Sequence, residues 1–318
     1  MPLSKFVKAA IVAGCLVAAA ALAASVLAGT YPALDIVSNG LPLLAAGLLV
    51  LVLASLALRS SMLIVTSAAL LAVTLAVLIP RLSGAAPQAP DGAARLLRIA
   101  TFNMWGKGDL HLRKVEKFLT SNDPDAVVLE EIRWKHEDFL RHLKTLYPYQ
   151  AGSHGLVILS KHPILKSGRL DRENQPYWRS LIVHWALLDV NGTEVKLVGA
   201  HMARPFYPAQ QKSDIDTLTA FVRSQTGPMI VAGDLNMTPW TQKLHQFTAE
   251  TGMRRFNTLV PTWPARWKDL PLPPLLPIDH VFVSPHLAKI NVRIGPRLES
   301  DHLPVVADIA LADVALAK

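Results

Sequence analysis

Several short apolar runs in the C-terminal two thirds of the sequence end or begin with a side chain that could do chemistry. The run VAGDLNMTPW places Asp234 and Asn236 two positions apart where a buried strand should end. Alternate residues of an extended chain share a face, so both could reach one ligand, although a simple turn also explains them. The other such positions are Asn103, Glu131, His201, Asp279, Asp301 and His302.

The chemistry of this set follows from its side-chain types. Taken singly, each residue could be a helix cap, an Asx turn or a satisfied core histidine. Taken together, carboxylate and amide oxygens are the ligands of a hard cation such as Mg²⁺, and substrate phosphates usually complete its coordination. A histidine beside a carboxylate is the usual means of activating water. The set is therefore suited to binding a divalent cation and delivering water.

The elements that must position these residues alternate strands with amphipathic helices. Period-2 or continuous apolar patterns predict strands, and the turn dipeptide NG at 191–192 joins two of them into an antiparallel hairpin. This mixture predicts sheet packed on sheet with helices outside. Strands are expected over 96–103, 125–132, 155–160, 179–190, 193–202, 229–236, 277–284, 290–294 and 303–311, and helices over 109–121, 134–146 and 209–226.

The N-terminal third is apolar and almost uncharged. Three runs, at about 6–28, 41–58 and 62–79, each approach the roughly 20 residues that a helix needs to cross a bilayer. A buried helical bundle is the alternative, and the first run could also be a signal peptide cleaved near ALAAS. Lys5, Lys8 and Arg59 should hold their ends in the cytoplasm. We therefore expect a three-span anchor over 1–80, a linker over 81–95 rich in Pro, Gly and Ala, and a domain over 96–318 outside the cytoplasm.

Composition adds two limits. The 318 residues are 51% hydrophobic, with a mean hydropathy of +0.30, because the apolar residues are concentrated at the N-terminus. The formal net charge is +8, most of it in the C-terminal domain, which suits an anionic substrate but fits a solvated surface equally well. The sole cysteine, Cys15, excludes an intrachain disulfide.

Five motifs between about 96 and 311 resemble, in order, those of the endonuclease/exonuclease/phosphatase superfamily, which includes DNase I-like nucleases, neutral sphingomyelinases and inositol polyphosphate 5-phosphatases. They are IATFNMW, PDAVVLEEI, GAHM, GDLNMTP and the closing pair PIDHVFVS with ESDHLPVV. The resemblance is strongest to bacterial membrane-anchored members. It implies a four-layer α/β sandwich, two packed mixed sheets flanked by helices, here preceded by three transmembrane helices.

The resemblance also implies a metal site. Glu131 takes the role of the ligand to Mg²⁺ (or Mn²⁺), with Asn103 and Asp301 nearby. Two departures concern this region. Glu130 replaces the family's common Gln, and Met104-Trp105 follow Asn103 where several members carry an acidic or amide residue two positions on, which puts a second metal ligand there in question.

Catalytic roles are implied in the same way. His302, oriented by Asp279, would take the proton from the attacking water, and Asp234 would align that water or the leaving oxygen. Asn236 would donate to a phosphoryl oxygen and His201 would stabilise the charge of the transition state. Arg179 is a candidate phosphate contact, although an ordinary surface arginine is an equal explanation.

The predicted function is hydrolysis of phosphodiester bonds in nucleic acid or a phospholipid head group by a membrane-anchored, divalent-metal-dependent phosphoesterase. Alternatives are a phosphomonoesterase on inositol or other small phosphates, and a catalytically silent binding module of the same fold. The sequence contains no H-E-x-x-H motif, which would have indicated a zinc hydrolase. The apolar spans also lack the intramembrane charges that a transporter would need. The expected location is the bacterial inner membrane, with the domain facing the periplasm or exterior, and the lipid bilayer is the one macromolecular partner expected besides the substrate.

Overall fold

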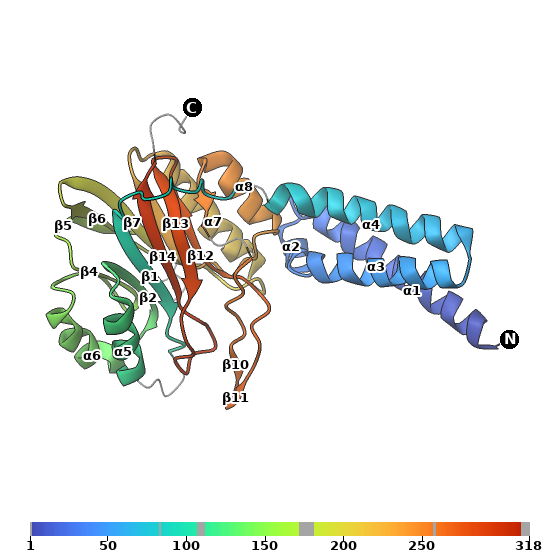
Figure 1. Cartoon of the computed structure of the whole chain (residues 1–318), viewed down its shortest axis with the longest axis horizontal. Helices are drawn as coiled ribbons and strands as arrows, with labels where there is room; N and C mark the ends of the chain where they lie inside the picture. The colour runs from blue at the N-terminus through green and yellow to red at the C-terminus, as the bar shows by residue number, and fades with distance from the viewer. Residues whose placement is uncertain (1, 83, 107–111, 172–180, 257–258, 313–318) are drawn as a thin grey trace.

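The apolar N-terminal third forms a bundle of helices that projects from one side of the molecule (Figure 1). The computed structural model describes residues 2–82, 84–106, 112–171, 181–256 and 259–312. The bundle helices are α1 (Pro2–Leu27), α3 (Leu41–Ala57) and α4 (Ser61–Leu82). Within the described residues, α1 and α4 are long and apolar enough to cross a membrane. A third span is obtained if α3 is joined to the short helices η1 (Pro32–Leu34) and α2 (Asp35–Ser38), from which it is bent by 55°.

The rest of the chain builds two six-stranded sheets. The first has the order β13-β14-β1-β2-β4-β3, in which β1 runs parallel to β2 and antiparallel to β14. Its strands are β1 (Leu97–Asn103), β2 (Ala126–Ile132), β3 (Tyr149–Ser153), β4 (Gly155–Ser160), β13 (Leu287–Ile294) and β14 (Val305–Leu311).

The second sheet has the order β5-β6-β7-β8-β12-β9, in which β7 and β8 are parallel and β12 is antiparallel to β8. Its strands are β5 (Ile164–Leu170), β6 (Ile182–Val190), β7 (Thr193–His201), β8 (Met229–Asp234), β9 (Arg254–Arg255) and β12 (Asp279–Val283). A separate two-stranded hairpin, β10 (Arg266–Trp267) with β11 (Leu270–Pro271), precedes β12.

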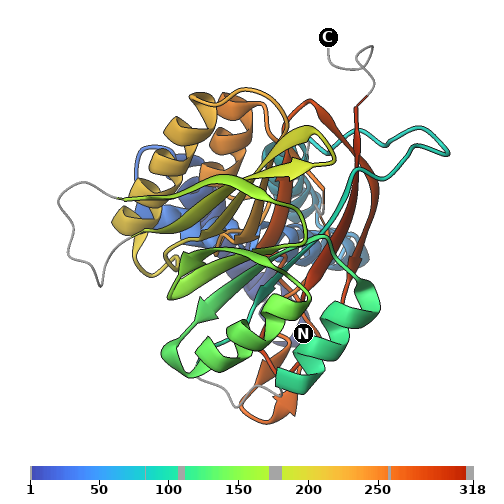
Figure 2. The ribbon, with the colours of Figure 1, turned by 90° about the vertical axis from the view of Figure 1, so that its left-hand side faces the viewer.

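Helices cover both outer faces, so the domain has four layers (Figure 2). The helical segments over the first sheet are α5 (Leu112–Asn122), η2 (Trp134–His136), α6 (Glu137–His142) and η3 (Leu143–Thr145). Those over the second are α7 (Pro208–Arg223) and α8 (Gln242–Thr251). One apolar cluster lies between the sheets and one lies under each helical layer. The predicted α/β sandwich is confirmed. The sequence patterns missed α8 and the edge strands β3 and β5.

The topology brings the predicted side chains to one edge. Strands β1 and β2 run in parallel, as do β7 and β8, so the carboxyl end of each pair lies at the same edge of its sheet. Gly233 is needed where β8 meets β7, because its φ is 145° and an added Cβ would lie 2.1 Å from the carbonyl oxygen of Ala200. The glycine of the GDLN motif therefore permits the close approach that places Asp234.

Residues that follow α4 pair with both sheets. The N–H of Ala86 donates to the carbonyl of Arg255 in β9, and the N–H of Ala89 donates to that of Lys289 in β13. Both pairings are parallel bridges to an edge strand. Within the stretch predicted as a linker, 84–89 thus lies hydrogen-bonded along the domain.

Candidate active site

A buried carboxylate–imidazole pair forms the centre of the site. Nδ1 of His302 lies 2.9 Å from Oδ2 of Asp279, and both side chains are buried. The hydroxyl of Thr262 donates to the same carboxylate oxygen, which fixes Asp279 from its other side. Burial lowers the pKa of His302, but the carboxylates of Asp279 and Asp234 outweigh it and raise the pKa to about 10. In this environment His302 is an imidazolium at neutral pH.

Asp234 lies next to this pair and is also buried. Its Oδ2 is 3.7 Å from Nε2 of His302 and 3.7 Å from Nε2 of His201. Burial raises its pKa to about 6, against the opposing effect of the two histidines. A carboxylate with a pKa near 6 can accept and release a proton at physiological pH.

Asn236 is held in a strained conformation beside Asp234. Its φ is 51°, in the left-handed region. Its N–H donates to Oδ1 of Asp234 at 2.8 Å, and its side-chain amide donates to the carbonyl of Met202 at 3.0 Å. Gln211, in α7, donates to the carbonyl of Asn236. The Asp-x-Asn spacing thus forms an Asx-type turn and also presents both side chains to the pocket, so the two interpretations of this motif are compatible.

A β-bulge aims Glu131 into the site. The register of β2 against β4 shifts between Glu130 and Ile132, and Glu131 has a φ of 55°. Bulges of this kind redirect a side chain at the rim of a sheet. Glu131 is held by the N–H of Gly106, at 3.0 Å from Oε2. Burial raises its pKa, but His201 and this hydrogen bond outweigh burial and leave the pKa below its ordinary value.

Glu130 points the other way and is completely buried. Its Oε2 accepts the N–H of Asp234 at 2.7 Å, and its Oε1 lies 2.8 Å from the hydroxyl of Thr101. Burial, with the charges of Asp234 and Asp279, holds its pKa well above the ordinary value. Both oxygens of Glu130 therefore accept a hydrogen bond, and the raised pKa favours the neutral acid, which has the same shape as a glutamine amide. Glu130 can therefore occupy the position at which the motif resemblance leads us to expect Gln.

Asn103 contacts two of the carboxylates. Its amide nitrogen lies 3.1 Å from Asp234 and 3.5 Å from Glu131, while its oxygen accepts the N–H of Trp105 at 2.9 Å. In this orientation it positions acidic side chains, and its own oxygen is already bonded. Its role as a direct metal ligand stays a prediction.

Two groups of side chains lie close enough together to be considered for a divalent cation, one of two carboxylates with an imidazole and one of carboxylates alone. One ligand atom each from Asp234, Asp279 and His302 lie within 4.8 Å of one another. Asp301 offers a second place, because its Oδ1 is buried without a hydrogen-bond partner, while its Oδ2 accepts the indole N–H of Trp263 at 3.2 Å. Burial raises the pKa of Asp301, and the negative charge of Glu131 adds to this effect. A cation shared by Glu131 and Asp301 would satisfy both.

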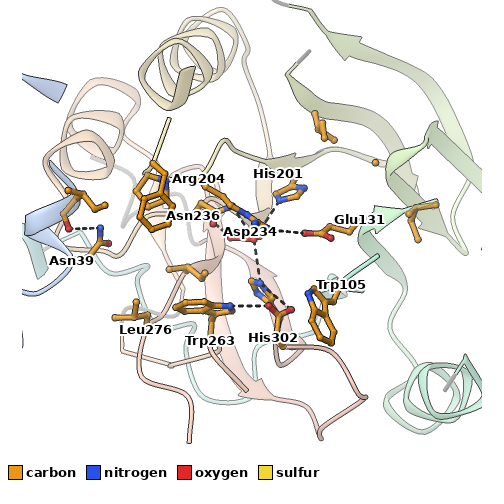
Figure 3. Close-up of a pocket in the computed structure, with 18 of the residues that line it drawn as sticks. Asn39, Trp105, Glu131, His201, Arg204, Asp234, Asn236, Trp263, Leu276 and His302 are labelled. Carbon is orange, nitrogen blue, oxygen red and sulfur yellow. Dashed lines mark hydrogen bonds and ion pairs between the residues drawn. The ribbon is translucent and has the colours of Figure 1, made fainter. Parts of the chain in front are cut away.

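Glu131, His201, Asp234, Asn236, Asp301 and His302 line one pocket of about 620 Å³ (Figure 3), and Asn103 and Asp279 support them from behind. His201, Asp234, His302 and Glu131 converge at its polar end, and Arg204 reaches over them with a guanidinium nitrogen 3.7 Å from Glu131. The remaining wall is largely apolar. It consists of Ile36, Trp105, Ile132, Gly155, Ile182, Pro205, Phe206, Trp263, Leu276 and Ile278, with Asn39 and Arg133 among them.

The structure brings together all but one of the predicted site residues. Arg179 lies outside the described residues. The sequence patterns did not identify Thr262, because its role depends on a contact with Asp279 made by the fold. They also did not identify Arg204, although it follows the predicted site residue His201 by only three positions. They also missed Asn39, which reaches the pocket from between the first two apolar helices.

Comparison with known proteins is consistent with this geometry. The sequence profile described as Endonuclease/Exonuclease/phosphatase family matches residues 100–302, more than half of the chain, from within β1 to His302. No curated protein sequence matches the chain.

Solved structures share the fold at low identity. An endonuclease/exonuclease/phosphatase from Beutenbergia cavernae has 21% identity and a TM-score of 0.55, covering 68% of this chain and 72% of its own. TDP2 from D. rerio, in complex with a single-strand DNA product, has 16% identity and a TM-score of 0.55, covering 67% and 98%. A mannosyl-6-phosphatase from Bacteroides thetaiotaomicron has 16% identity and a TM-score of 0.53, covering 68% and 100%.

Proposed function

Because the chain belongs to the endonuclease/exonuclease/phosphatase family, we propose that it is a membrane-anchored, divalent-metal-dependent phosphoesterase that attacks a phosphodiester with water. The observation that carries this proposal is the convergence of the Asp279–His302 pair, Asp234 and Glu131 at one end of a single pocket. Hydrolysis of an anionic ester needs positive charge on the phosphoryl oxygens and a base for water, and this end of the pocket offers both.

The pKa values of His302 and Asp234 support one choice of proton acceptor. The sequence interpretation made His302 the base, yet an imidazole whose pKa is raised to about 10 holds its proton at neutral pH. Asp234, with a pKa of about 6, is the better acceptor for the proton of the attacking water. His302, oriented by Asp279, then presents its Nε2–H to a phosphoryl or leaving oxygen. Asn236 and His201 border the same space and can hydrogen-bond to the phosphoryl group.

Glu131 and Asp301 are the residues we expect to hold the cation, with Asn103 keeping Glu131 in place. Oxygen ligands of this kind suit Mg²⁺ or Mn²⁺. When bound, the cation supplies Lewis-acid polarisation of a phosphoryl oxygen, and its charge lowers the pKa values of the neighbouring acids. Arg204 lies close enough to Glu131 to contact a phosphate bound there.

Membrane anchoring through α1, α4 and the α2–α3 pair is the second part of the proposal. The N-terminus and the turn between α3 and α4 lie at the end of the bundle remote from the sandwich (Figure 1). Lys5 and Lys8 belong to the first turns of α1 and Arg59 to that turn, which supports a cytoplasmic end there and a domain in the periplasm or outside the cell. The bacterial inner membrane fits this arrangement.

The experiment uses the full chain purified in detergent. With Mn²⁺ or Mg²⁺ it should hydrolyse bis(p-nitrophenyl) phosphate, and a chelator should stop the reaction. H302A should lower the rate by about 10²-fold or more, whereas H142A, a matched control at an exposed histidine in α6, should not. A parallel reaction with p-nitrophenyl phosphate tests the phosphomonoesterase alternative. Activity that survives both chelation and H302A would refute the mechanism, and no activity on any ester would favour the silent binding module.

A further inference from the structure

The segment between α1 and α3, residues 28–40, is bound tightly to the sandwich. Asp35, which is buried, accepts the N–H groups of Gln242 at 2.9 Å and Lys243 at 3.1 Å, and so caps the N-terminus of α8. The buried ammonium of Lys243 lies 3.6 Å from Asp35 and donates to the carbonyl of Pro32 at 2.9 Å. These bonds join the apolar helices to the domain at a fixed place.

Asn39 extends this contact to the catalytic loop. Its Oδ1 accepts the N–H of Thr238 at 3.2 Å and the hydroxyl of Thr238 at 3.0 Å. The indole of Trp240 donates to the Asn39 carbonyl, and Arg81 at the end of α4 donates to the carbonyl of Trp240. Residues 237–240 directly follow Asn236. The helix ends are therefore bonded to the loop that carries Asp234 and Asn236, and the distance between site and bundle is set by these bonds.

The same segment supplies part of the pocket wall. Ile36 and Asn39 line the pocket that holds His302 and Glu131. In Figure 3, Leu276 and Trp263 lie on the side of the pocket toward Asn39, and Glu131 lies across from them. The pocket thus has a polar end at the catalytic residues and a largely apolar wall that leads to the ends of α1 and α3.

Apolar side chains continue outward from this wall. Ile36 is 37% exposed and Phe206 is 76% exposed. Tyr207, Trp267, Leu270 and Leu275 are also exposed, and Trp267 and Leu270 belong to the β10–β11 hairpin on the side of the sandwich that carries the bundle. Exposed Trp and Tyr side chains are typical of membrane–water interfaces, so this surface is suited to contact with the headgroup region. The helix α1, at a rise of about 1.5 Å per residue, is longer than the roughly 30 Å hydrocarbon core, so its last turn reaches that region.

We propose that the substrate is a membrane lipid with a phosphoester head group, taken from the leaflet on which the domain rests. This inference rests on the proposed function and names its substrate class. The phosphate enters the polar end of the pocket, and the apolar part of the lipid lies along Ile36, Leu276 and Phe206, close to the helix ends. Single-stranded nucleic acid is the less favoured substrate. Trp105, Trp263 and Arg204 in the pocket could stack on or bind it. The part of the wall at Ile36 and Leu276, however, is aliphatic, and Ile36 belongs to the segment that joins the membrane helices.

The test compares phosphoester substrates that are held in a bilayer with substrates that are dissolved in water. The full chain, reconstituted in vesicles of phosphatidylethanolamine and phosphatidylglycerol with Mn²⁺, should release water-soluble phosphate products from the vesicle lipids. It should do so faster than it hydrolyses dihexanoyl phosphatidylglycerol below its micellar concentration or single-stranded DNA. H302A is the blank for every arm.

Substitutions of Ile36 test the proposed contact between the pocket wall and the apolar part of the lipid. I36S should lower the ratio of lipid turnover to bis(p-nitrophenyl) phosphate turnover by about tenfold, because an apolar contact with the lipid is lost. I36L, which keeps an aliphatic side chain, should show the same ratio of lipid to bis(p-nitrophenyl) phosphate turnover as the wild type. L165S, at an exposed leucine of β5 outside the pocket, should leave it unchanged. Because Ile36 is partly exposed, its replacement should keep the fold, which the unfolding temperature checks.

The outcomes separate the two proposals. Hydrolysis of bis(p-nitrophenyl) phosphate and DNA without lipid turnover would overturn the lipid inference and leave the phosphoesterase proposal standing. An unchanged ratio in I36S would also overturn the lipid inference. Absence of metal-dependent activity in every arm would overturn both.

Discussion

Asp279 and Asp234 lie directly opposite each other in the antiparallel pairing of β12 with β8, and His302 contacts both carboxylates. The pairing register therefore places two negative charges beside the His302 imidazole, and these raise its pKa. Replacing Asp279 by Asn removes the nearer charge, so the pKa of His302 should fall, and turnover should fall by about 10²-fold or more because the ring loses its orientation. NMR titration of the histidine and the rate of ester hydrolysis measure the two effects. D269N, at an exposed carboxylate in the β10–β11 turn, is the control. A His302 pKa that does not move in D279N would contradict this account.

The pH dependence of turnover should report Asp234. A base works only when ionised, so kcat/KM should rise with pH through about 6 and then level off. Because the reaction needs the cation, the limb measured with Mg²⁺ or Mn²⁺ should lie somewhat below the metal-free value of about 6, since a nearby cation favours the carboxylate. D234N should lower the plateau and abolish the limb. A limb that persists unchanged in D234N would assign the titration to another group.

Glu130 should behave as a glutamine in the folded state. Its pKa is raised on folding, so its contribution to stability is present below the ordinary value of 4.5 and is lost as pH rises toward the raised value. E130Q keeps both hydrogen bonds and cannot ionise. Chemical denaturation should therefore show E130Q more stable than the wild type at neutral and alkaline pH, with the difference vanishing in acid. An E130Q protein less stable than the wild type at every pH would contradict the neutral assignment.

Asp35 should hold the helical bundle on the sandwich. D35A removes the cap of α8, at a cost of about 1–2 kcal/mol, and leaves the ammonium of Lys243 buried, which costs about 3–5 kcal/mol more. The unfolding temperature in detergent should drop accordingly. In the double variant D35A/K243M the stranded charge is gone, so part of the loss should be recovered. Additive losses from the two substitutions would show that the pair is not coupled.

Orientation can be read by labelling cysteines, because the chain has only one natural cysteine. In a C15A background, D269C should react with a membrane-impermeant maleimide on intact spheroplasts, since this side chain is exposed on the domain. S61C, at the first residue of α4, whose α3–α4 turn lies at the remote end of the bundle in Figure 1, should react only after lysis. The reverse pattern would place the domain in the cytoplasm.

Much of the arrangement could be predicted from the sequence because the informative residues lie at strand ends. Parallel pairing of β1 with β2 and of β7 with β8 collects those ends without any fine adjustment. Amphipathic spacing was also sufficient for α5 and α7, whereas the two-residue strand β9 is too short to carry any pattern.

The remaining features of the site depend on tertiary contacts or on shifts of strand register, and neither of these produces a periodic pattern in the sequence. Strand alternation alone cannot say whether Glu130 or Glu131 faces the pocket, since the answer depends on the bulge at Glu131. Thr262 acts only through the fold that places it against Asp279. The cap by Asp35 joins positions more than 200 residues apart, and a lone acid between two apolar runs was the single hint of it.

The pairing of residues 84–89 with β9 and then β13 affects association between molecules. Both strands are sheet edges, whose unpaired N–H and C=O groups would otherwise offer a template for another chain. The stretch that leaves α4 therefore shields one edge of each sheet, β9 and β13, from edge-to-edge aggregation, and it does so only while it remains covalently attached ahead of the domain. Proteolytic release of the sandwich after residue 95 would expose both edges at once, so the freed fragment should be prone to self-association even with every catalytic side chain intact.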